Sequence, residues 1–445
     1  MKDEPKQLQV PIVLARARQG ADTPGRDWSW VEATVWTERM LSALANGVKG
    51  NKWFSLMDKV ERPATLAAAW TKVASNGGAA GVDKQSIERF AAESEKYLDE
   101  LTQSLRERNY RPQPVRRVEI PKSDGKKRPL GIPTVKDRIV QTALKFVLEP
   151  IFEAQFLNGS YGFRPGRSCK DALREVDRLL REGFTYVVDA DLQSYFDSIP
   201  HGRLMQCVEE RVSDGALLEL IARFLKQNIL HEGQCWTPTN GTPQGAVISP
   251  LLANVYLHPL DVLMEAGGYR MVRYADDFVI LCSNREDALL ALEKVRGWVE
   301  ENGLMLHPDK THVGDCRQVG EGFEFLGYRF EAGQRRVRKK SLQRLKEKIK
   351  AKTSRSRGDS LATVVSDLNP MLKGWFNYFK HAHERTFSKL DGQIRRRLRA
   401  LLRKQSKRPG FGHCLHDHQR WPNQFFAAVG LFTMHTARQD ARQPR

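Results

Sequence analysis

The 445-residue sequence has few cysteines, and none of them are paired at the spacing of a metal or redox motif. The six cysteines are scattered along the chain: Cys169, Cys207, Cys235, Cys282, Cys316 and Cys414. No C-x-x-C pair occurs, which argues against a zinc ribbon. It also indicates reduced thiols in a cytosol-like compartment.

Long apolar runs are missing as well. No run approaches the ~20 residues that a membrane-spanning helix needs, and the start, MKDEPKQLQVPIV, lacks the apolar stretch of a signal peptide. Because 40% of the residues are hydrophobic and 9% are aromatic, a wholly disordered chain is excluded. We therefore expect a soluble, intracellular protein of several domains.

Acidic residues are scarce in one segment. The whole chain has 72 Lys and Arg against 53 Asp and Glu, a net charge of +19. Residues 335–408 hold 24 basic and 5 acidic residues, so this segment carries the entire excess. Such a density of positive charge is typical of a surface that meets nucleic acid or an anionic membrane.

Helical and strand patterns alternate along the chain. Helical spacing covers residues 31–48, 63–75, 87–107, 135–156, 169–182, 204–212, 217–227, 248–264, 285–301 and most of 340–404. Strand patterns cover 115–132 with a central turn, 185–192, a hairpin around 270–282, and short stretches up to 330. Helices mixed with antiparallel hairpins predict an α+β fold, followed by a helical module.

Two adjacent carboxylates, Asp276 and Asp277, interrupt the apolar string RMVRYADDFVILC. A solvated hairpin turn would explain them, but a carboxylate pair between hydrophobic arms is costly to desolvate without a cation. The strand TYVVDADL offers Asp189 and Asp191 on one face, and alternation cannot choose between them. With Asp191 near the hairpin, three carboxylates could bind two Mg²⁺ ions for phosphoryl transfer.

Seven motifs follow one another along the chain: IPKSDGKKRPLGIPTVKDRIVQ, GSYGFRPGRS, VVDADLQSYFDSI, GTPQGAVISPLLANVYLHPLD, RYADDFVI, GLMLHPDKT and FEFLGYRF. Together they resemble the ordered blocks of a group II intron-encoded reverse transcriptase of the bacterial type, from about residue 51 to 330. LNPMLKGWFNYFK resembles the maturase or thumb region of that family. The tail without cysteine pairs resembles class C members, which lack the HNH endonuclease domain.

The resemblance implies a right-hand polymerase, with fingers and a palm followed by an α-helical thumb. It implies that Asp191, Asp276 and Asp277 are catalytic and hold two Mg²⁺ ions together with the Leu192 carbonyl. Asp189 and Asp197 are then not ligands.

The resemblance also assigns contacts to substrates. Lys122 and Arg128 match contacts to the incoming triphosphate, a role that suits their charge. Phe196 matches a gate against the ribose 2′-hydroxyl, although such a residue is more often in the core. The remaining dNTP positions are Gln244 and Gly245, and the primer and template positions are Arg164, Arg167, Phe325, Leu326, Gly327 and Tyr328.

The basic helical segment is the expected RNA-binding region, through Lys373, Arg395, Arg396, Arg397 and Arg399. A membrane-surface helix is the alternative, but the apolar stripe of IRRRLRALLRK is only a few aliphatic residues wide. The resemblance gives this segment two tasks: clamping the template–primer duplex and binding intron RNA for splicing. We expect Trp375 and Tyr378 to be largely structural.

The tail contains HCLHDH, with His413, Cys414, His416 and His418. Its spacing is not that of a zinc finger, so we do not expect zinc. The expected domains are a leader (1–27), an N-terminal extension and start of the fingers (28–115), fingers and palm (116–330), a helical thumb and maturase region (331–408) and a short tail that could bind DNA (409–445).

The expected function is therefore RNA-directed DNA polymerisation by a cytoplasmic, bacterial protein. Its partners would be dNTPs, an RNA template with a DNA primer, group II intron RNA and target DNA, with no membrane. Two alternatives stay open. One is a host-retained reverse transcriptase in repair or phage defence, and the other is a splicing-only, RNA-binding maturase.

Overall fold

The computed structural model describes residues 28–121 and 127–441, and the contacts between residues divide the chain into two units. Unit 1 comprises residues up to 182 together with 190–281 and 286–312, and unit 2 comprises 183–189, 282–285 and 313 onward. No helix in the described ranges is long and apolar enough to cross a membrane. Lys122 lies outside the described residues.

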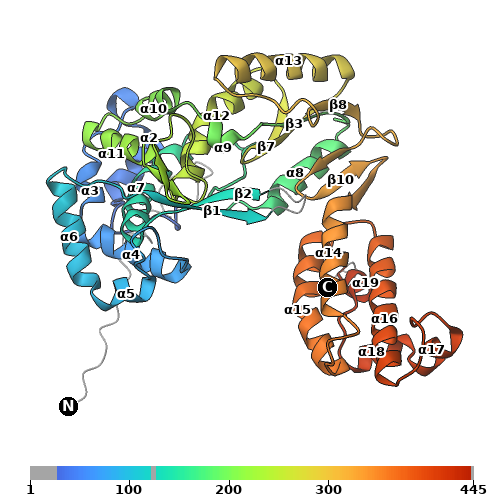
Figure 1. The fold of residues 1–445 in the computed structure, drawn as a ribbon. Helices are drawn as coiled ribbons and strands as arrows, with labels where there is room; N and C mark the ends of the chain where they lie inside the picture. The colour runs from blue at the N-terminus through green and yellow to red at the C-terminus, as the bar shows by residue number, and fades with distance from the viewer. Residues whose placement is uncertain (1–27, 122–126, 442–445) are drawn as a thin grey trace. The chain divides into compact units, whose positions relative to one another are not determined.

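Unit 1 begins with a layer of helices around α7 (Val135–Glu153), which is buried along most of its length. Thr134 starts α7 by accepting a hydrogen bond from the Asp137 amide. The helices that precede it are α2 (Glu38–Asn46), η1 (Lys49–Asn51), α3 (Met57–Val60), α4 (Pro63–Asn76), α5 (Ile87–Ala92) and α6 (Ser94–Arg106) (Figure 1). The single helix expected over 87–107 is two helices, because the backbone leaves helical geometry at Glu93.

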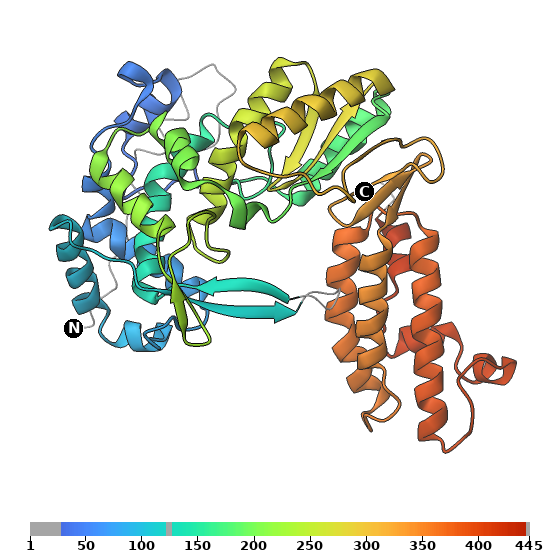
Figure 2. The same ribbon diagram turned by 45° about the horizontal axis from the view of Figure 1, so that its top comes forward.

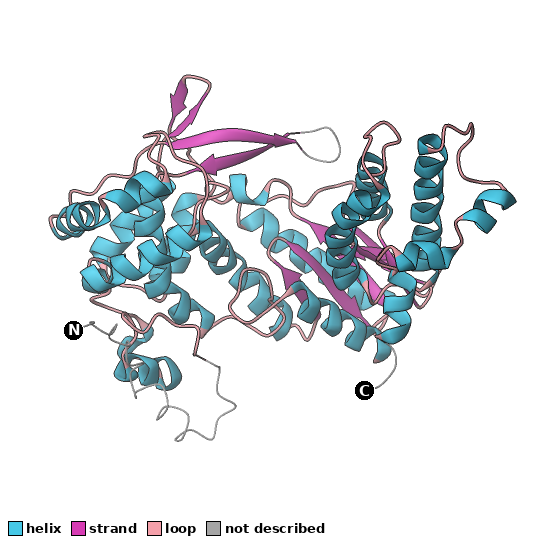
Figure 3. Ribbon diagram, turned by 90° about the horizontal axis from the view of Figure 1, so that it is seen from below, coloured by secondary structure: helices cyan, strands magenta, loops and turns pink. Residues whose placement is uncertain are grey.

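A long hairpin follows these helices. Strands β1 (Val115–Pro121) and β2 (Lys127–Ile132) pair antiparallel, as the sequence predicts (Figure 3). A second hairpin, β4 (Ile229–His231) and β5 (Gln234–Trp236), extends this sheet, because β4 runs parallel to the start of β1. The strand order is β2-β1-β4-β5. The β4–β5 hairpin was not predicted.

The rest of unit 1 surrounds a hairpin of β6 (Arg270–Tyr274) and β7 (Asp277–Cys282), in which Val272 lies opposite Val279 (Figure 2). The end of β3 (Tyr186–Asp191) belongs to the same sheet. Helices α8 (Cys169–Arg181) and α12 (Ser249–Ala266) pack on β6. The other helices are α9 (Tyr195–Ser198), α10 (His201–Glu209), α11 (Gly215–Leu225) and α13 (Arg285–Glu301).

Unit 2 combines short strands with a helical bundle. Strands β9 (Phe323–Phe325), β10 (Tyr328–Glu331) and β11 (Gln334–Val337) form an antiparallel sheet of order β11-β10-β9, and β8 (His312–Asp315) precedes them. The bundle contains α14 (Lys339–Lys352), α15 (Leu361–Phe379), α16 (Arg385–Gln405) and α19 (Met434–Asp440), with α17 (Leu415–Arg420) and α18 (Asn423–Ala428) in the tail (Figure 1). The α+β fold with a helical module is confirmed, whereas the domain boundaries stay predictions.

A buried carboxylate ties the helical layer to the start of the β1–β2 hairpin. Asp137 is fully buried and accepts hydrogen bonds from Tyr110 Oη at 2.7 Å, Thr134 Oγ1 at 2.8 Å and Gln227 Nε2 at 3.2 Å. Burial raises the pKa of Asp137 from 3.8 to about 6. The Asp137 carboxyl therefore binds a proton more tightly in the folded chain than in the unfolded chain. The carboxyl contributes most stability below about pH 4 and loses part of it as the pH rises through 6.

We predict that Asp137→Ala lowers the free energy of unfolding by about 2–4 kcal/mol, because it leaves buried donors without an acceptor. The loss should be larger at pH 4.5 than at pH 7.5. Urea unfolding followed by circular dichroism at both pH values measures it. Asp99→Ala on the exposed face of α6 is the control and should change stability by less than about 0.5 kcal/mol. A loss independent of pH would contradict the assigned titration.

Candidate active site

The β6–β7 hairpin presents the two adjacent carboxylates at its turn. Tyr274 pairs with Asp277, so Ala275 and Asp276 form the tip and Asp277 begins β7. Ala275 adopts a left-handed backbone with φ of 61°, which a tight two-residue turn requires. The predicted hairpin is confirmed.

Asp191 ends β3 and belongs to unit 1 with the hairpin. Its carbonyl oxygen accepts a hydrogen bond from the His307 amide at 2.8 Å, and the next residue, Leu192, pairs with Leu306 in an antiparallel bridge. Lys310 donates from Nζ to Asp191 Oδ2 at 2.6 Å. Lys310 was not among the predicted site residues, although it lies in the GLMLHPDKT motif.

The Asp276 carboxyl lies within the electrostatic influence of Asp191. Burial raises the pKa of Asp276, and the negative charge of Asp191 raises it further, while Arg128 and Arg273 act in the opposite direction. A bound cation would relieve both the desolvation and the repulsion. Within the described ranges, no group of three or more His, Cys, Asp or Glu side chains is close enough to be a complete metal site. The carboxylate oxygens are donors that suit a divalent cation, although the described residues do not form a ready-made ligand set.

The Arg273 side chain stabilises the β6–β7 hairpin through buried hydrogen bonds. Its side chain is fully buried, and Nε donates to Asp261 Oδ1 at 2.7 Å while a second N–H group donates to Oδ2. Its Nη1 donates to Asn254 Oδ1 and to the Ala275 carbonyl, both at 2.9 Å. The guanidinium therefore links α12 to the residue before Asp276. An arginine inside an apolar strand, with an aspartate in a nearby apolar helix, was the signal that could have found it.

The GSYGFRPGRS motif supports the hairpin through its backbone. Tyr161 N donates to the Arg273 carbonyl and Arg273 N donates to the Gly159 carbonyl, both at 2.8 Å. A Cβ on Gly162 would lie 2.2 Å from the Ala275 nitrogen, so only glycine fits there. This motif therefore braces the turn that carries Asp276.

The expected template contact of Arg164 is wrong, because its side chain is only 1% exposed. Arg164 Nε donates to Glu153 Oε2 at 2.9 Å and Nη1 donates to the Ser160 carbonyl at 2.7 Å. Buried ion pairs of this kind need all their donors satisfied inside the protein. Arg167 donates to the Asn158 carbonyl at 2.7 Å, and its template role stays a prediction.

Three of the predicted dNTP positions lie together. Arg128 Nε donates to Gln244 Oε1 at 3.0 Å, joining β2 to the turn before α12. Gly245 has φ of 107°, and a Cβ there would lie 2.3 Å from the Gly131 carbonyl oxygen. Phe196, in α9, is half-buried, as a partly core residue would be. The turn thus needs glycine for its own close packing.

The FLGY segment forms the turn between β9 and β10 in unit 2. Phe325 and Tyr328 are buried, and the expected contact of this segment with the primer stays a prediction. Leu326 and Gly327 are half-buried and adopt left-handed backbones, with φ of 47° and 82°. Tyr378 Oη donates to the Leu326 carbonyl at 2.8 Å, so Tyr378 is structural, as predicted.

The predicted RNA-binding arginines of α16 differ in exposure. Arg396 is exposed and Arg395 and Arg397 are half-buried, and Lys373 of α15 is exposed. Arg399 is buried, with Nε donating to the Trp421 carbonyl at 2.9 Å, so its expected RNA contact is wrong. It fixes the tail to α16 instead.

The HCLHDH segment is tied to α16 by an ion pair. Cys414 Sγ donates to Asp417 Oδ2 at 3.1 Å, and Arg403 Nη1 donates to the same carboxylate at 2.8 Å. His413 Nε2 lies 3.1 Å from Arg396 Nη1. The polar side chains of this segment thus have a structural role, because they attach the segment to α16.

Comparison with known families decides the identity. The reverse transcriptase (RNA-dependent DNA polymerase) model matches residues 120–330, and the group II intron maturase-specific domain matches residues 342–421. The chain belongs to the group II intron-encoded reverse transcriptases. It is thus by family an RNA-directed DNA polymerase with a maturase domain, and reverse transcriptases generally use divalent metal ions.

Several known proteins resemble parts of this chain. The chain is 37% identical over 319 residues to Protein YkfC of Escherichia coli (strain K12), covering 62% of this reverse transcriptase and 82% of that protein. It is 41% identical over 203 residues to Group II intron-encoded protein LtrA of Lactococcus lactis subsp. cremoris, covering 45% of this chain but 33% of LtrA. The solved Partial Cas6-RT-Cas1--Cas2 complex matches 56% of this chain and 41% of that chain at 28% identity, with a TM-score of 0.36.

We predict that Arg273→Met and Asp261→Leu each lower the free energy of unfolding by about 3–5 kcal/mol, because each leaves one buried charge unpaired. The double variant should recover much of this loss, since it removes both charges from the core. Thermal unfolding of the three variants measures the coupling. Primer extension by the double variant should remain low, because the Ala275 carbonyl has lost its donor. Additive losses would show that the pair does not act as a unit.

Proposed function

We propose that this reverse transcriptase extends a DNA primer on an RNA template by using two Mg²⁺ ions held by Asp191, Asp276 and Asp277. The observation that carries the proposal is that the negative charge of Asp191 lies close enough to the half-buried Asp276 carboxyl to raise its pKa. They come from segments 85 positions apart in sequence but belong to one compact unit. Hard oxygen donors of this charge are those that Mg²⁺ prefers.

The proposed reaction is attack of a primer 3′-oxygen on the α-phosphate of a dNTP, with pyrophosphate leaving. The ions, when bound, would supply positive charge for the attacking and leaving oxygens. Asp191, Asp276 and Asp277 would hold them, with the Leu192 carbonyl as a further oxygen donor. The remaining task of the protein would be to position the primer and the dNTP for this reaction.

Other residues would act on the nucleotide. Arg128 is exposed and fixed through Gln244, so its remaining N–H groups can pair with triphosphate oxygens. Gln244 and Gly245 would line the pocket for the nascent base pair, and Phe196 would crowd a ribose 2′-hydroxyl. Lys122 remains the second proposed triphosphate contact on the basis of its motif.

The partners follow from the two domains. The maturase domain and the positive charge of residues 335–408 support binding of RNA, and we propose that this RNA is a group II intron whose splicing and mobility the protein assists. Target DNA would be a further partner. Action as a host-retained reverse transcriptase remains the second candidate, and intron RNA domains flanking the reading frame would favour the mobile element.

We predict that Asp276→Ala lowers the rate of primer extension on an RNA template by at least about 10³-fold, because a metal-binding oxygen is lost. Single-turnover extension with saturating dNTP and Mg²⁺ measures this rate. Binding of the template–primer should change less than about threefold, since the substitution leaves the basic residues intact.

Asp189→Asn is the matched control, because it changes a carboxyl group on the same strand as Asp191. Asp189 accepts a hydrogen bond from the Glu324 amide at 3.3 Å and is not a proposed ligand. Its extension rate should remain within about threefold of the unmodified protein. Full activity in the Asp276 variant would exclude the proposed site.

A further inference from the structure

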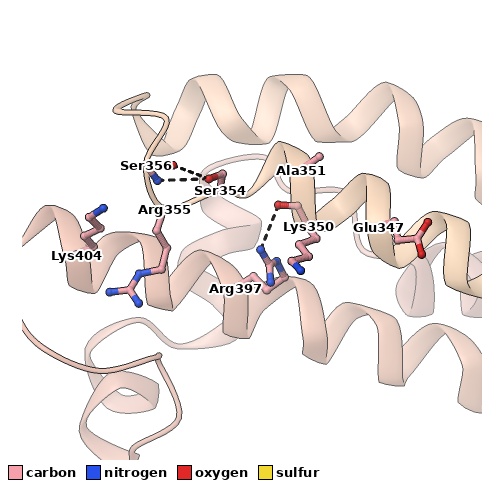
Figure 4. Close-up of a pocket in the computed structure, with 8 residues that line it drawn as sticks. All are labelled: Glu347, Lys350, Ala351, Ser354, Arg355, Ser356, Arg397 and Lys404. Atoms are coloured by element: carbon pink, nitrogen blue, oxygen red, sulfur yellow. Dashed lines mark hydrogen bonds between the residues drawn. The ribbon is translucent and has the colours of Figure 1, made fainter.

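A basic groove lies between α14 and α16 in unit 2, remote in sequence from the catalytic aspartates (Figure 4). Its volume is about 740 Å³. The lining residues are Glu347, Lys350, Ala351, Ser354, Arg355, Ser356, Arg397 and Lys404. Four of these side chains are positively charged and one is negatively charged, so the groove suits an anion.

The groove is elongated along the two helices. Arg397 and Lys404 lie seven residues apart on α16, which is two helical turns or about 10 Å along the axis. Figure 4 shows Arg355 and Lys404 at one end of the groove and Glu347 at the other. The cations therefore follow the groove over a length greater than that of a single small anion.

The Arg397 guanidinium is held in a fixed orientation. Its Nε donates to Thr353 Oγ1 at 2.6 Å and its Nη2 donates to the Lys350 carbonyl at 3.2 Å. Burial lowers the pKa of Arg397, and the neighbouring Arg396 lowers it further. An anion in the groove would compensate this positive charge.

The other cations of the groove also lack compensation. Neither Lys350 nor Lys404 forms an ion pair with a described residue, and Glu347 accepts a hydrogen bond from Gln343 instead. Arg355 Nε is buried and has no acceptor among the described residues. Guanidinium and ammonium groups arranged in this way bind phosphate oxygens.

The length of the groove matches a short strand of nucleic acid. The groove is long enough for more than one phosphate of a strand, because its cations extend over about 10 Å. The hydroxyls of Ser354 and Ser356, which lie 2.9 Å apart, add two possible donors. Ala351 is the only apolar side chain in the lining, which disfavours a membrane surface.

An exposed aromatic ring lies next to the groove. Phe411 is 68% exposed, and the Arg355 guanidinium lies 4.9 Å from the centre of its ring. Arginine covers one part of this ring, and the rest is available for stacking. Unpaired bases stack on such aromatic rings, whereas bases inside a duplex are not accessible to them.

We propose that this groove binds an unpaired RNA segment, with successive phosphates along Lys350, Arg355, Arg397 and Lys404 and one base on Phe411. The inference deepens the proposed RNA partnership, on which it rests. It gives the maturase region a binding site for a looped or single-stranded part of its RNA. Binding here does not require the catalytic aspartates.

The test uses the full chain with Lys350→Gln, Arg355→Gln and Lys404→Gln combined. Fluorescence anisotropy measures binding of a labelled 12-nucleotide oligouridylate and of a 12-base-pair RNA duplex at several KCl concentrations. We expect the affinity for the unpaired RNA to fall about 100-fold at low salt. The slope of log affinity against log salt should decrease by about 2, which is about 0.7 for each of three lost contacts.

Two controls make the result specific. Lys348→Gln, Lys389→Gln and Arg408→Gln combined remove the same charge from exposed positions outside the lining and should change affinity less than about threefold. Phe411→Ala should lower affinity for the unpaired RNA about tenfold without changing the salt slope, because it removes stacking and no charge. Thermal unfolding verifies that each variant is folded.

Crosslinking locates the bound strand. Oligouridylate containing 4-thiouridine, irradiated on the full chain, should crosslink to the peptide that contains Phe411. The proposal would be overturned if crosslinks were confined to other peptides. It would also be overturned if the groove variant lost duplex and unpaired RNA binding equally. A third contradicting result is groove-dependent binding to phosphatidylserine vesicles with unchanged RNA binding. Primer extension should persist in the groove variant at saturating template–primer, whereas failure of the polymerase proposal would appear as an unaltered rate in the Asp276 variant.

Discussion

The buried ion pair between Arg273 and Asp261 fixes the part of the chain on which the chemistry depends. Its two side chains are 0% and 3% exposed, and Arg273 also reaches the carbonyl of Ala275, directly before Asp276. Such a pair contributes little net stability compared with apolar packing, but it specifies one arrangement, because any other leaves a charge buried and unpaired. The turn can therefore keep a left-handed residue and a half-buried carboxylate in place. Gly162 completes this support, because a side chain there would collide with the turn.

The candidate active site has an excess of negative charge, whereas the α14–α16 groove has an excess of positive charge. Around Asp191 and Asp276 the problem is excess negative charge in a partly desolvated place, which a metal ion would relieve and which Lys310 already relieves at Asp191. In the α14–α16 groove the problem is excess positive charge, which phosphates would relieve. The residues proposed for polymerisation and those proposed for RNA recognition are therefore separate sets, so each can be altered by substitution without directly removing a group from the other.

Periodicity predicts most of the helices and the two main hairpins, because the apolar faces of α7, α12 and α15 follow their spacing closely. It misses β4 and β5, which are three residues each and too short for a pattern. Charge and motif order predict Asp191, Asp276 and Asp277 as site residues. They do not distinguish an arginine on the surface from a buried one. Arg164 and Arg399 are therefore misjudged, since their partners Glu153 and Trp421 are found only through tertiary packing. The same reason hides Arg273, whose partner lies 12 positions away on another element.

The central claim is that Asp191 and the Asp276–Asp277 pair surround the same divalent cation. Replacing Mg²⁺ by Fe²⁺ and adding ascorbate and peroxide generates hydroxyl radicals at the bound ion, which cut the nearby backbone, and mass spectrometry identifies the cut positions. The account predicts cuts near residue 191 and near residues 275–277 at the same Fe²⁺ concentration, with both suppressed by excess Mg²⁺. Cuts at only one of these segments, or cuts elsewhere that Mg²⁺ suppresses, would contradict it.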